Sequence, residues 1–290
     1  MLERWARPLS GLWNWLARVM DAIYKPLGRP GKLLQDFLNG SWLGHSLHPV
    51  VVDVVVGGST AAVLLQILSW LGVGSLHDAM LWVLGLTWLA GLSAIVTGLT
   101  DFKDTATGDE RDMVGLHGLI NIIATLVFIV AFFVLLGAPD GGGLGGWLLV
   151  IGYLVLSTGA FIGGHVVFKY GYMVNHNAFA KGKKAKEFTA VLPAADLPDA
   201  TATKAMLGTT ALVVVRRGDV VFALKETCSH AGGPLSEGKL EGDTIICPWH
   251  GSAFRLSDGA VRHGPSATRQ IAYRARISDG QVEVQGPNAA

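Results

Sequence analysis

Cysteine and charge are scarce in this sequence of 290 residues. It holds only two cysteines, and charged residues make up 16% of it, with a formal net charge of +1. That near balance excludes a broad basic surface, so nucleic acid is not an expected partner. Half of the residues are hydrophobic and the mean hydropathy is +0.42. This composition is not that of an ordinary soluble domain.

The two cysteines lie in two short boxes, CSHAGGPL and CPWHGSAF, which pair Cys228 with His230 and Cys247 with His250. Two thiolates suit one iron and two imidazoles the other, which is the ligand division of a Rieske [2Fe–2S] centre. A structural zinc ion also takes two Cys and two His. In the usual zinc motifs, however, one box holds two cysteines and the other two histidines, whereas each box here holds one cysteine and one histidine. We favour the cluster over zinc and over a site without metal, and no cysteine is left for a disulfide.

Residues 227–256 resemble the cluster-binding loops of Rieske proteins, and the resemblance covers roughly the last hundred residues. In respiratory members each box holds an extra cysteine, and the two form a disulfide. Here Gly233 and Trp249 stand at those places, as in Rieske ferredoxins. Glycine-rich segments around Gly232, Pro234 and Gly251 let backbone N–H groups approach the sulfides.

The resemblance also implies a shell around the cluster. Ser252 matches a hydroxyl that bonds a sulfide in the respiratory family, whereas that family's tyrosine is Phe254 here. Fewer hydrogen bonds to sulfur stabilise the reduced cluster less, which predicts a potential below the high end of the Rieske range. Pro265 matches a proline-containing loop that shields the cluster. We interpret His263 as a surface histidine and not a ligand.

Four apolar runs, at about residues 48–71, 79–99, 115–136 and 147–168, are each long enough to cross a bilayer. Buried soluble helices are the alternative, but four such runs leave too little polar surface in a chain of this size. Their short connections, of roughly seven, fifteen and ten residues, can join only antiparallel neighbours. The sequence therefore predicts a four-helix up-down transmembrane bundle with both termini on one side.

Lysine and arginine are missing from two of the loops between these runs, GVGSLHD and GAPDGGGLGG. Basic residues gather instead before the first run, at Arg4, Arg7, Arg18, Lys25, Arg29 and Lys32, and after the fourth, at Lys169, Lys181, Lys183, Lys184 and Lys186. The positive-inside rule then places both termini and the cluster on the cytoplasmic side. We see no cleavable or twin-arginine leader at the start. A multi-pass protein of the bacterial inner membrane is expected.

The flanking segments complete the predicted architecture. Residues 5–27 have the pattern of an amphipathic helix in the headgroup region, and a helix packed on the bundle is the alternative. Alternating runs around Gly218 and Asp279-Gly280 predict β-hairpins in a small antiparallel domain. We expect four segments: 1–44 interfacial, 45–175 transmembrane, 176–187 a basic tether, and 188–290 an antiparallel β Rieske domain.

Ionisable residues also mark one end of the predicted bundle. His48 and His117 open spans and Asp101 and His165 close spans, so an up-down bundle collects all four at the cytoplasmic end. Such groups are costly in a membrane and normally mark a site or pathway. His117 and His165 lie at similar depth and could ligate a b-type haem. Lys103 or Arg111 would then pair with its propionates, or the same groups would hold a quinone headgroup. Another metal and a purely structural role both stay open.

Residues 45–175 resemble a bacterial family of four-helix membrane domains of unassigned function. The resemblance rests on His48-Pro49, on Gly98 with Asp101, and on histidines in the third and fourth spans. That family often has a further histidine where this chain has Asp53, which weakens any haem assignment that needs that position.

Two functions follow from these features. The first is a membrane-anchored electron-transfer protein that links a membrane redox carrier, quinone or haem b, to a cytoplasmic-side partner, with quinol-linked oxidoreduction left open. The second is an accessory wiring or docking subunit of a larger respiratory or photosynthetic complex, with a purely structural bundle. Self-association is also open. No histidine follows His263, so the second iron site of a Rieske oxygenase is not expected.

Overall fold

The computed structural model describes residues 2–74, 76–138, 143–179 and 185–287. Contacts divide the chain into two compact units. One comprises Met1–Gly31 with Ser46–Tyr170, and the other Lys32–His45 with Gly171–Ala290. Residues 180–184 of the predicted tether lie outside the described residues.

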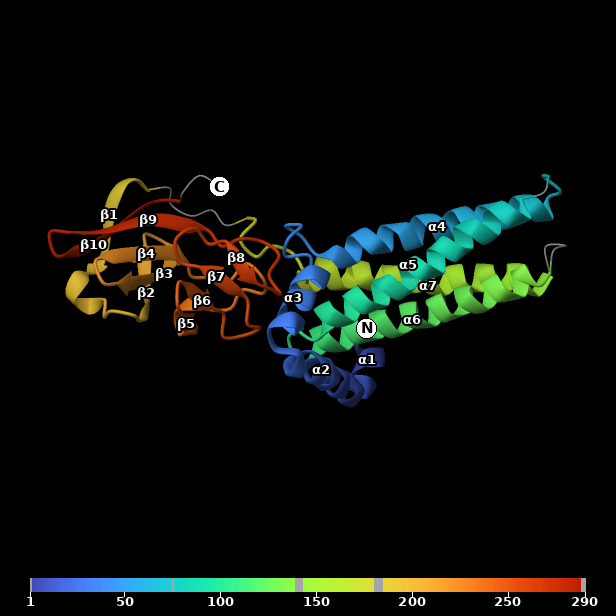
Figure 1. Ribbon diagram of the computed structural model, residues 1–290, viewed down its shortest axis with the longest axis horizontal. Helices are drawn as coiled ribbons and strands as arrows, with labels where there is room; N and C mark the ends of the chain where they lie inside the picture. The colour runs from blue at the N-terminus through green and yellow to red at the C-terminus, as the bar shows by residue number, and fades with distance from the viewer. Residues whose placement is uncertain (1, 75, 139–142, 180–184, 288–290) are drawn as a thin grey trace. The chain divides into compact units, whose positions relative to one another are not determined.

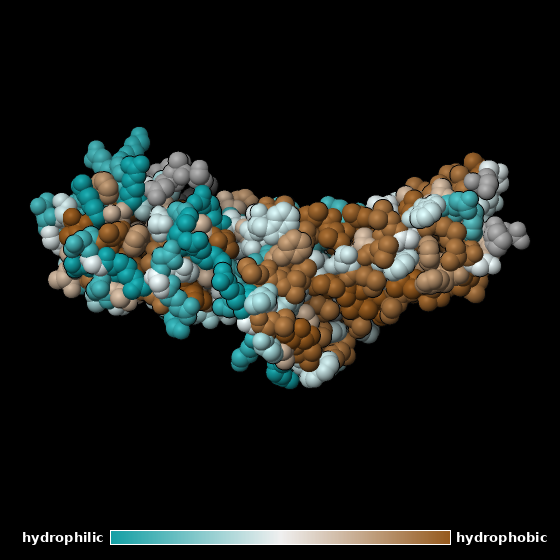
Figure 2. Space-filling view, in the orientation of Figure 1, coloured by the Kyte–Doolittle hydropathy of each residue, from teal (hydrophilic) through white to brown (hydrophobic). Residues whose placement is uncertain are grey.

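Four long helices form the first unit: α4 (Leu47–Trp70), α5 (His77–Phe102), α6 (Asp109–Leu136) and α7 (Gly143–Tyr170) (Figure 1). All four are long and apolar enough to cross a membrane. Only 28–39% of each apolar window is buried within the protein, and the face in Figure 2 is largely hydrophobic over these helices. The predicted four-span bundle is confirmed, and the chain is a multi-pass membrane protein.

Three of the four helices, α5, α6 and α7, extend further than the apolar runs, whereas α4 matches its run to within one residue. Helix α6 begins at Asp109, about two turns before the predicted start, and carries Asp109, Glu110 and Asp112 in its first turn. Carboxylates are favourable there because they interact with the positive end of the helix dipole. Hydropathy marks only the lipid-facing part of a helix, which explains the difference.

Glycines let the helices approach closely at several points. A Cβ at Gly152 of α7 would lie 2.7 Å from the Phe128 ring of α6, and one at Gly91 of α5 would lie 2.9 Å from the Thr125 side chain. Small residues at helix contacts are typical of membrane bundles, where packing rather than water exclusion stabilises association.

The N-terminal segment consists of α1 (Glu3–Ala6), η1 (Arg7–Leu9), α2 (Ser10–Tyr24) and η2 (Lys25–Leu27), followed by α3 (Gly28–Leu38). Helix α2 buries Trp13 and Tyr24, and the Tyr24 hydroxyl lies 2.7 Å from Thr100 Oγ1 of α5. Trp15 and Ile23 of the same helix are 53% and 54% exposed. Helix α2 therefore packs one face on the bundle and leaves further apolar side chains outside.

The second unit holds two antiparallel sheets. The six-stranded sheet has the order β1-β10-β9-β4-β3-β2, and the four-stranded sheet the order β5-β6-β7-β8. The strand bounds are β1 Ala185–Pro193, β2 Ala202–Leu207, β3 Thr210–Arg217, β4 Val220–Lys225, β5 Lys239–Glu241, β6 Thr244–Ile246, β7 Ala253–Arg255, β8 Val261–His263, β9 Ala272–Ser278 and β10 Gln281–Gly286, with short η3 at Ala194–Asp196 and η4 at Leu235–Glu237.

Both predicted hairpins are present. Strands β3 and β4 pair up to Arg217 and Val220, and β9 and β10 pair up to Ser278 and Gln281. The second turn has φ values of +49° at Asp279 and +73° at Gly280, a conformation that favours Asp-Gly. A membrane bundle joined to an antiparallel β domain is thus the architecture of this chain.

Candidate functional site

Two loops of equal length carry the two Cys-His boxes. Cys228–Gly233 follows β4, and its flanking residues Thr227 and Pro234 form an isolated antiparallel bridge. Cys247–Ser252 joins β6 to β7 and is closed by the last pair of that ladder. Each cysteine begins its loop at the edge of an apolar core, because both are buried and pack with residues such as Leu235.

The backbone of the two loops follows one hydrogen-bond pattern. In each, the cysteine N–H donates to the carbonyl of the sixth residue, at 2.9 and 2.8 Å, and the fifth residue donates back to the cysteine carbonyl, at 3.0 and 3.1 Å. The fifth residue is Gly232 in one loop and Gly251 in the other, with φ of +81° and +77°. Glycine adopts this left-handed conformation without steric cost.

The two thiols lie together. Cys228 and Cys247 share a hydrogen bond, and each sulfur also accepts backbone N–H groups from the second and third residues that follow it. Donating that bond, together with burial, raises the pKa of Cys228 well above its usual range, and accepting it lowers the pKa of Cys247. Inward N–H donors stabilise negative charge on sulfur, as a thiolate–iron centre requires.

The two imidazoles also lie together. The ring centres of His230 and His250 are 5.1 Å apart, with the rings nearly perpendicular. A metal–nitrogen bond of about 2 Å plus about 1 Å from the nitrogen to the ring centre places two imidazoles at about 5 Å on one tetrahedral metal. The arrangement therefore fits two thiolates on one iron and two imidazoles on the other.

Gly233 closes the space beside the sulfurs. A Cβ there would lie 2.8 Å from Cys247 Sγ and 3.0 Å from the Trp249 indole. No larger side chain fits without displacing one of them. The neighbouring Trp249 is 57% exposed and His250 is half-buried, whereas His230 is buried, so the site comes nearest to the surface at His250.

Comparison with known proteins agrees with this geometry. Residues 187–276 match the family model of the Rieske [2Fe-2S] domain. "Ferredoxin CarAc" of Metapseudomonas resinovorans is 38% identical over 80 residues, which are 28% of this chain and 75% of that protein. The chain belongs to the Rieske [2Fe–2S] family. Its C-terminal part is a Rieske ferredoxin-like electron-transfer domain, and the [2Fe–2S] cluster is its cofactor.

Two further likenesses concern the same domain. The "Anthranilate 1,2-dioxygenase ferredoxin subunit" of Burkholderia cepacia is 39% identical over 77 residues, which are 27% of this chain and 71% of that protein. A solved structure titled "Complex of reduced oxygenase and oxidized ferredoxin in carbazole 1,9a-dioxygenase" is 32% identical, with a TM-score of 0.34, over 36% of this chain and 98% of that one. Residues 44–176 match a second family, described as "Predicted membrane protein (DUF2231)".

The shell of the Rieske site is built from buried serines and the proline loop. The fully buried Ser252 hydroxyl accepts the Ser266 N–H at 3.0 Å, which orients its own proton elsewhere. Ser229 bonds Ser266 Oγ at 2.9 Å and so ties the first cluster loop to the same segment. Pro265 is buried beside Ser266. Phe254 is fully buried in the core, and it offers no hydroxyl to a sulfide.

Asp36 was not predicted to take part in this site. Its carboxylate accepts His263 Nδ1 at 2.8 Å and the Gly264 N–H at 2.7 Å. The contact spans more than 220 residues of sequence, and no local pattern around Asp36 announces it. His263 is thus hydrogen-bonded to Asp36, and a segment outside the Rieske family match holds the proline loop.

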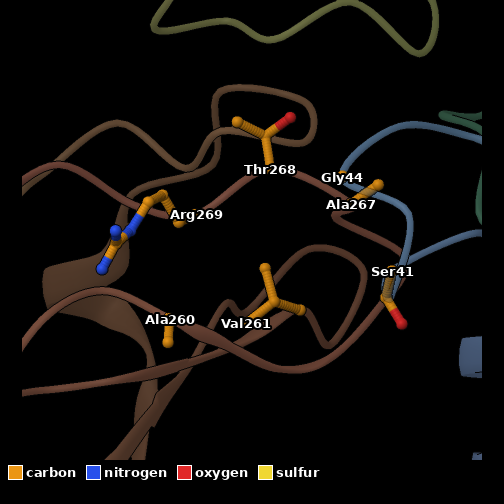
Figure 3. A pocket seen from close by; sticks show the side chains of 7 residues that line it. All are labelled: Ser41, Gly44, Ala260, Val261, Ala267, Thr268 and Arg269. Carbon is orange, nitrogen blue, oxygen red and sulfur yellow. The ribbon is translucent and has the colours of Figure 1, made fainter. Parts of the chain in front are cut away.

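A pocket lies beside the same loop, between residues 41–44 and 260–269 (Figure 3). Ser41, Gly44, Val261 and Thr268 line it, with Arg269 as its charged residue. None of the cluster-loop cysteines or histidines belongs to its lining. The pocket is therefore separate from the metal-ligating chemistry of the domain.

In the membrane unit, the structure brings His48 and His117 together, with ring centres 6.4 Å apart. His165, the predicted candidate partner of His117, lies 3.4 Å from Glu3 of α1. Lys169 also bonds Glu3 and lowers the pKa of that carboxyl well below its usual range. Similar depth in the bundle did not decide which histidines meet, because each helix also has a rotational orientation.

The other predicted members of the membrane site have different partners. Asp101 is buried and accepts the Ser46 hydroxyl at 2.8 Å. Lys103 forms an ion pair with Asp104 at 2.5 Å. Arg111 donates to the Thr105 carbonyl at 2.6 Å, and it also bonds Asn14 of α2 at 3.0 Å. These contacts hold the α5–α6 connection and the N-terminal helix together at this end of the bundle.

Proposed function

We propose that this protein is a membrane-anchored Rieske electron-transfer protein. Its cluster is held by Cys228, His230, Cys247 and His250, and it exchanges single electrons between a membrane redox carrier, quinone or haem b, and a partner on the cytoplasmic side. The chain divides into an N-terminal segment (1–44), a four-span domain (45–175), a tether (176–187) and the Rieske domain (188–290).

One observation carries the proposal: two equal loops that pair the thiols and the imidazoles stand in a β domain covalently joined to a four-helix membrane bundle. Exposed Trp249 lies next to the ligand His250. An imidazole edge near the surface suits electron transfer, because electron tunnelling requires close approach and the histidines can couple it to proton movement.

The cytoplasmic orientation of both termini is part of the proposal and has its own test. Reporter fusions placed after residue 287 and in the α4–α5 connection would report the two sides of the membrane. We expect a reporter that is active in the cytoplasm to work at the C-terminal site, and one that is active in the periplasm to work in the connection, because the excess of Lys and Arg lies at the termini. The reverse pattern would contradict this orientation.

The relatives favour a second candidate. Those named above are a ferredoxin and the ferredoxin subunit of a dioxygenase, so the cluster could serve a protein partner while the bundle acts only as an anchor or docking element in a larger complex. In that case the membrane histidines only stabilise helix packing, and neither quinone nor haem b exchanges electrons with the cluster.

Full-length protein in proteoliposomes distinguishes the two candidates. A quinol analogue is added, and reduction of the cluster is followed by EPR; a soluble ferredoxin reductase with NADH is added to a parallel sample. Reduction by quinol supports exchange with the membrane carrier. Reduction by the soluble donor alone would overturn that part of the proposal and support the anchored subunit.

A further inference from the structure

Two histidines in the bundle are held in the same way by different helices. His48, near the start of α4, places its Nδ1 3.0 Å from the Ala94 carbonyl of α5. Gly98, four residues further along α5, leaves room for the ring: a Cβ there would lie 2.9 Å from His48 Cε1. The imidazole is thus fixed by one carbonyl and one glycine of the neighbouring helix.

The second hairpin repeats this arrangement. His117, near the start of α6, places its Nδ1 2.8 Å from the Gly159 carbonyl of α7. A Cβ at Gly163, again four residues further, would lie 2.7 Å from His117 Cε1. Two antiparallel helix pairs therefore present one histidine each at the same end of the bundle. The further neighbours of Nδ1 differ: Thr97 Oγ1 lies 3.2 Å from that of His48, and Asn121 Nδ2 lies 3.2 Å from that of His117.

The hydrogen bonds determine which ring nitrogen is available. A backbone carbonyl only accepts, and it is the nearest partner of Nδ1 in both rings, at 3.0 and 2.8 Å, so we assign the ring proton to Nδ1. In the neutral imidazole the lone pair is then on Nε2. A histidine that donates Nδ1–H to a carbonyl and presents Nε2 is oriented as metal-ligating histidines are.

The spacing fits one metal between the two rings. The ring centres are 6.4 Å apart and the planes are 86° from parallel. A metal–nitrogen bond of about 2 Å plus about 1 Å to the ring centre, on each side, puts two opposite imidazoles about 6 Å apart. The distance is longer than the 5.1 Å between His230 and His250, where the fit was to adjacent positions on a tetrahedral metal.

We propose that His48 and His117 ligate one transition-metal ion on a common axis through their Nε2 atoms. Imidazole suits Fe, Cu and Ni rather than Mg or Ca, and two opposite imidazoles do not suit the tetrahedral coordination of Zn²⁺. The ion is therefore either the iron of a haem or a bare Cu or Ni ion. The redox role of this metal rests on the proposed function, because the metal would be the membrane redox carrier and the two histidines its ligands. The metal binding itself is independent of the cluster.

Asparagine variants separate ligation from packing. The amide nitrogen of asparagine occupies nearly the place of Nδ1, so His48→Asn and His117→Asn keep a donor for the carbonyl and remove Nε2. His165→Asn is the matched control, because His165 also lies in a span but faces Glu3. The cluster EPR signal, measured in every variant, shows that the protein is folded and loaded.

The experiment measures the metal content of full-length protein in detergent, before and after incubation with hemin, with Cu²⁺ or with Ni²⁺. The content is counted as equivalents beyond the two cluster irons. We expect one equivalent in the wild type and in His165→Asn, and binding at least about tenfold weaker in the other two variants. A bis-imidazole haem spectrum identifies haem; one equivalent of Cu or Ni without that spectrum identifies a bare ion. No binding of any probe by the wild type, or equal binding by all variants, would overturn the inference. Quinol-driven reduction of the cluster can succeed or fail independently of this result.

Discussion

Ser252 is the buried hydroxyl that the resemblance to respiratory Rieske proteins assigns to a cluster sulfide. It accepts the Ser266 N–H, so its own proton remains to be donated. A hydrogen bond to the cluster stabilises its reduced state, which carries more negative charge. Ser252→Ala should therefore lower the midpoint potential by about 40–80 mV, if one such bond contributes about 1–2 kcal/mol. Redox titration followed by EPR measures the shift.

Ser229→Ala is the matched control for that titration. Ser229 is a buried serine of the other cluster loop, but its hydroxyl bonds Ser266 Oγ and the Thr268 carbonyl, the latter at 2.8 Å. Its loss removes contacts to the proline loop and none to sulfur, so the potential should change much less. Equal shifts in the two variants would contradict a specific role for Ser252.

Gly233 tests the space around the sulfurs. Because a Cβ would lie 2.8 Å from Cys247 Sγ, Gly233→Ala should strongly reduce the amount of cluster per chain. In Gly251→Ala the Cβ meets nothing within 4 Å, and the cost is only the left-handed φ, of about 1–2 kcal/mol. Iron and acid-labile sulfide analysis of both variants measures the difference. Full cluster occupancy in Gly233→Ala would contradict this expectation, because it would show that the loops can accommodate a Cβ beside Cys247 Sγ.

At the scale of elements, Asp36 holds the proline loop from outside the family domain. It accepts two hydrogen bonds, from His263 and Gly264, and its side chain is 20% exposed. Asp36→Ala leaves both donors without this acceptor and should destabilise the β unit by about 1–3 kcal/mol, with faster loss of the cluster. Asp36→Asn keeps one acceptor oxygen and should lose less. Thermal unfolding and the decay of cluster absorbance measure both effects, and wild-type behaviour of Asp36→Ala would contradict them.

Helix α2 offers a matched pair of tryptophans. Trp13 is 3% exposed and packs so closely on Gly115 that a Cβ there would lie 2.4 Å from its ring, whereas Trp15 is 53% exposed. Trp13→Ala should cost about 3–5 kcal/mol of stability because it leaves a cavity against the bundle. Trp15→Ala should cost much less. Thermal unfolding in detergent compares them; similar losses would mean that α2 is not held by its buried face.

The elements could be predicted where their signal is local. Four apolar runs and two Asp- or Gly-containing turns predicted the spans and hairpins, because lipid-facing surface and turn conformation are properties of short segments. The sequence could not predict that α2 packs one face on the bundle and leaves other apolar side chains exposed. An apolar stripe does not reveal whether lipid or protein covers it. The early start of α6 was missed because carboxylates lower hydropathy while they favour a helix N-terminus.

At the scale of the whole molecule, the Cys-His boxes could be selected from spacing alone, because the chemistry needs both ligand types close in sequence. Contacts between segments that are distant in the sequence could not be predicted in this way. The pairing of His48 with His117 depends on how α4 and α6 are rotated, and Asp36 meets Gly264 only through the tertiary fold. The sequence predicts groups at one end of a bundle, and side-chain packing decides which of them meet.

The whole chain combines a Rieske [2Fe–2S] domain and a four-span membrane domain. Respiratory Rieske subunits, in the resemblance described above, carry a disulfide and a tyrosine that this chain replaces with Gly233, Trp249 and Phe254. The potential should therefore lie in the lower part of the range of about −150 to +300 mV. A midpoint near the upper limit would contradict this expectation.

The most direct test of the central claim is the EPR spectrum of the full-length, iron-loaded protein after complete reduction. The account predicts a Rieske-type signal from one [2Fe–2S] cluster per chain, lost in Cys247→Ser and in His250→Ala. Absence of that signal from the reduced wild type, or an unchanged signal in either variant, would contradict the assignment of these residues as cluster ligands.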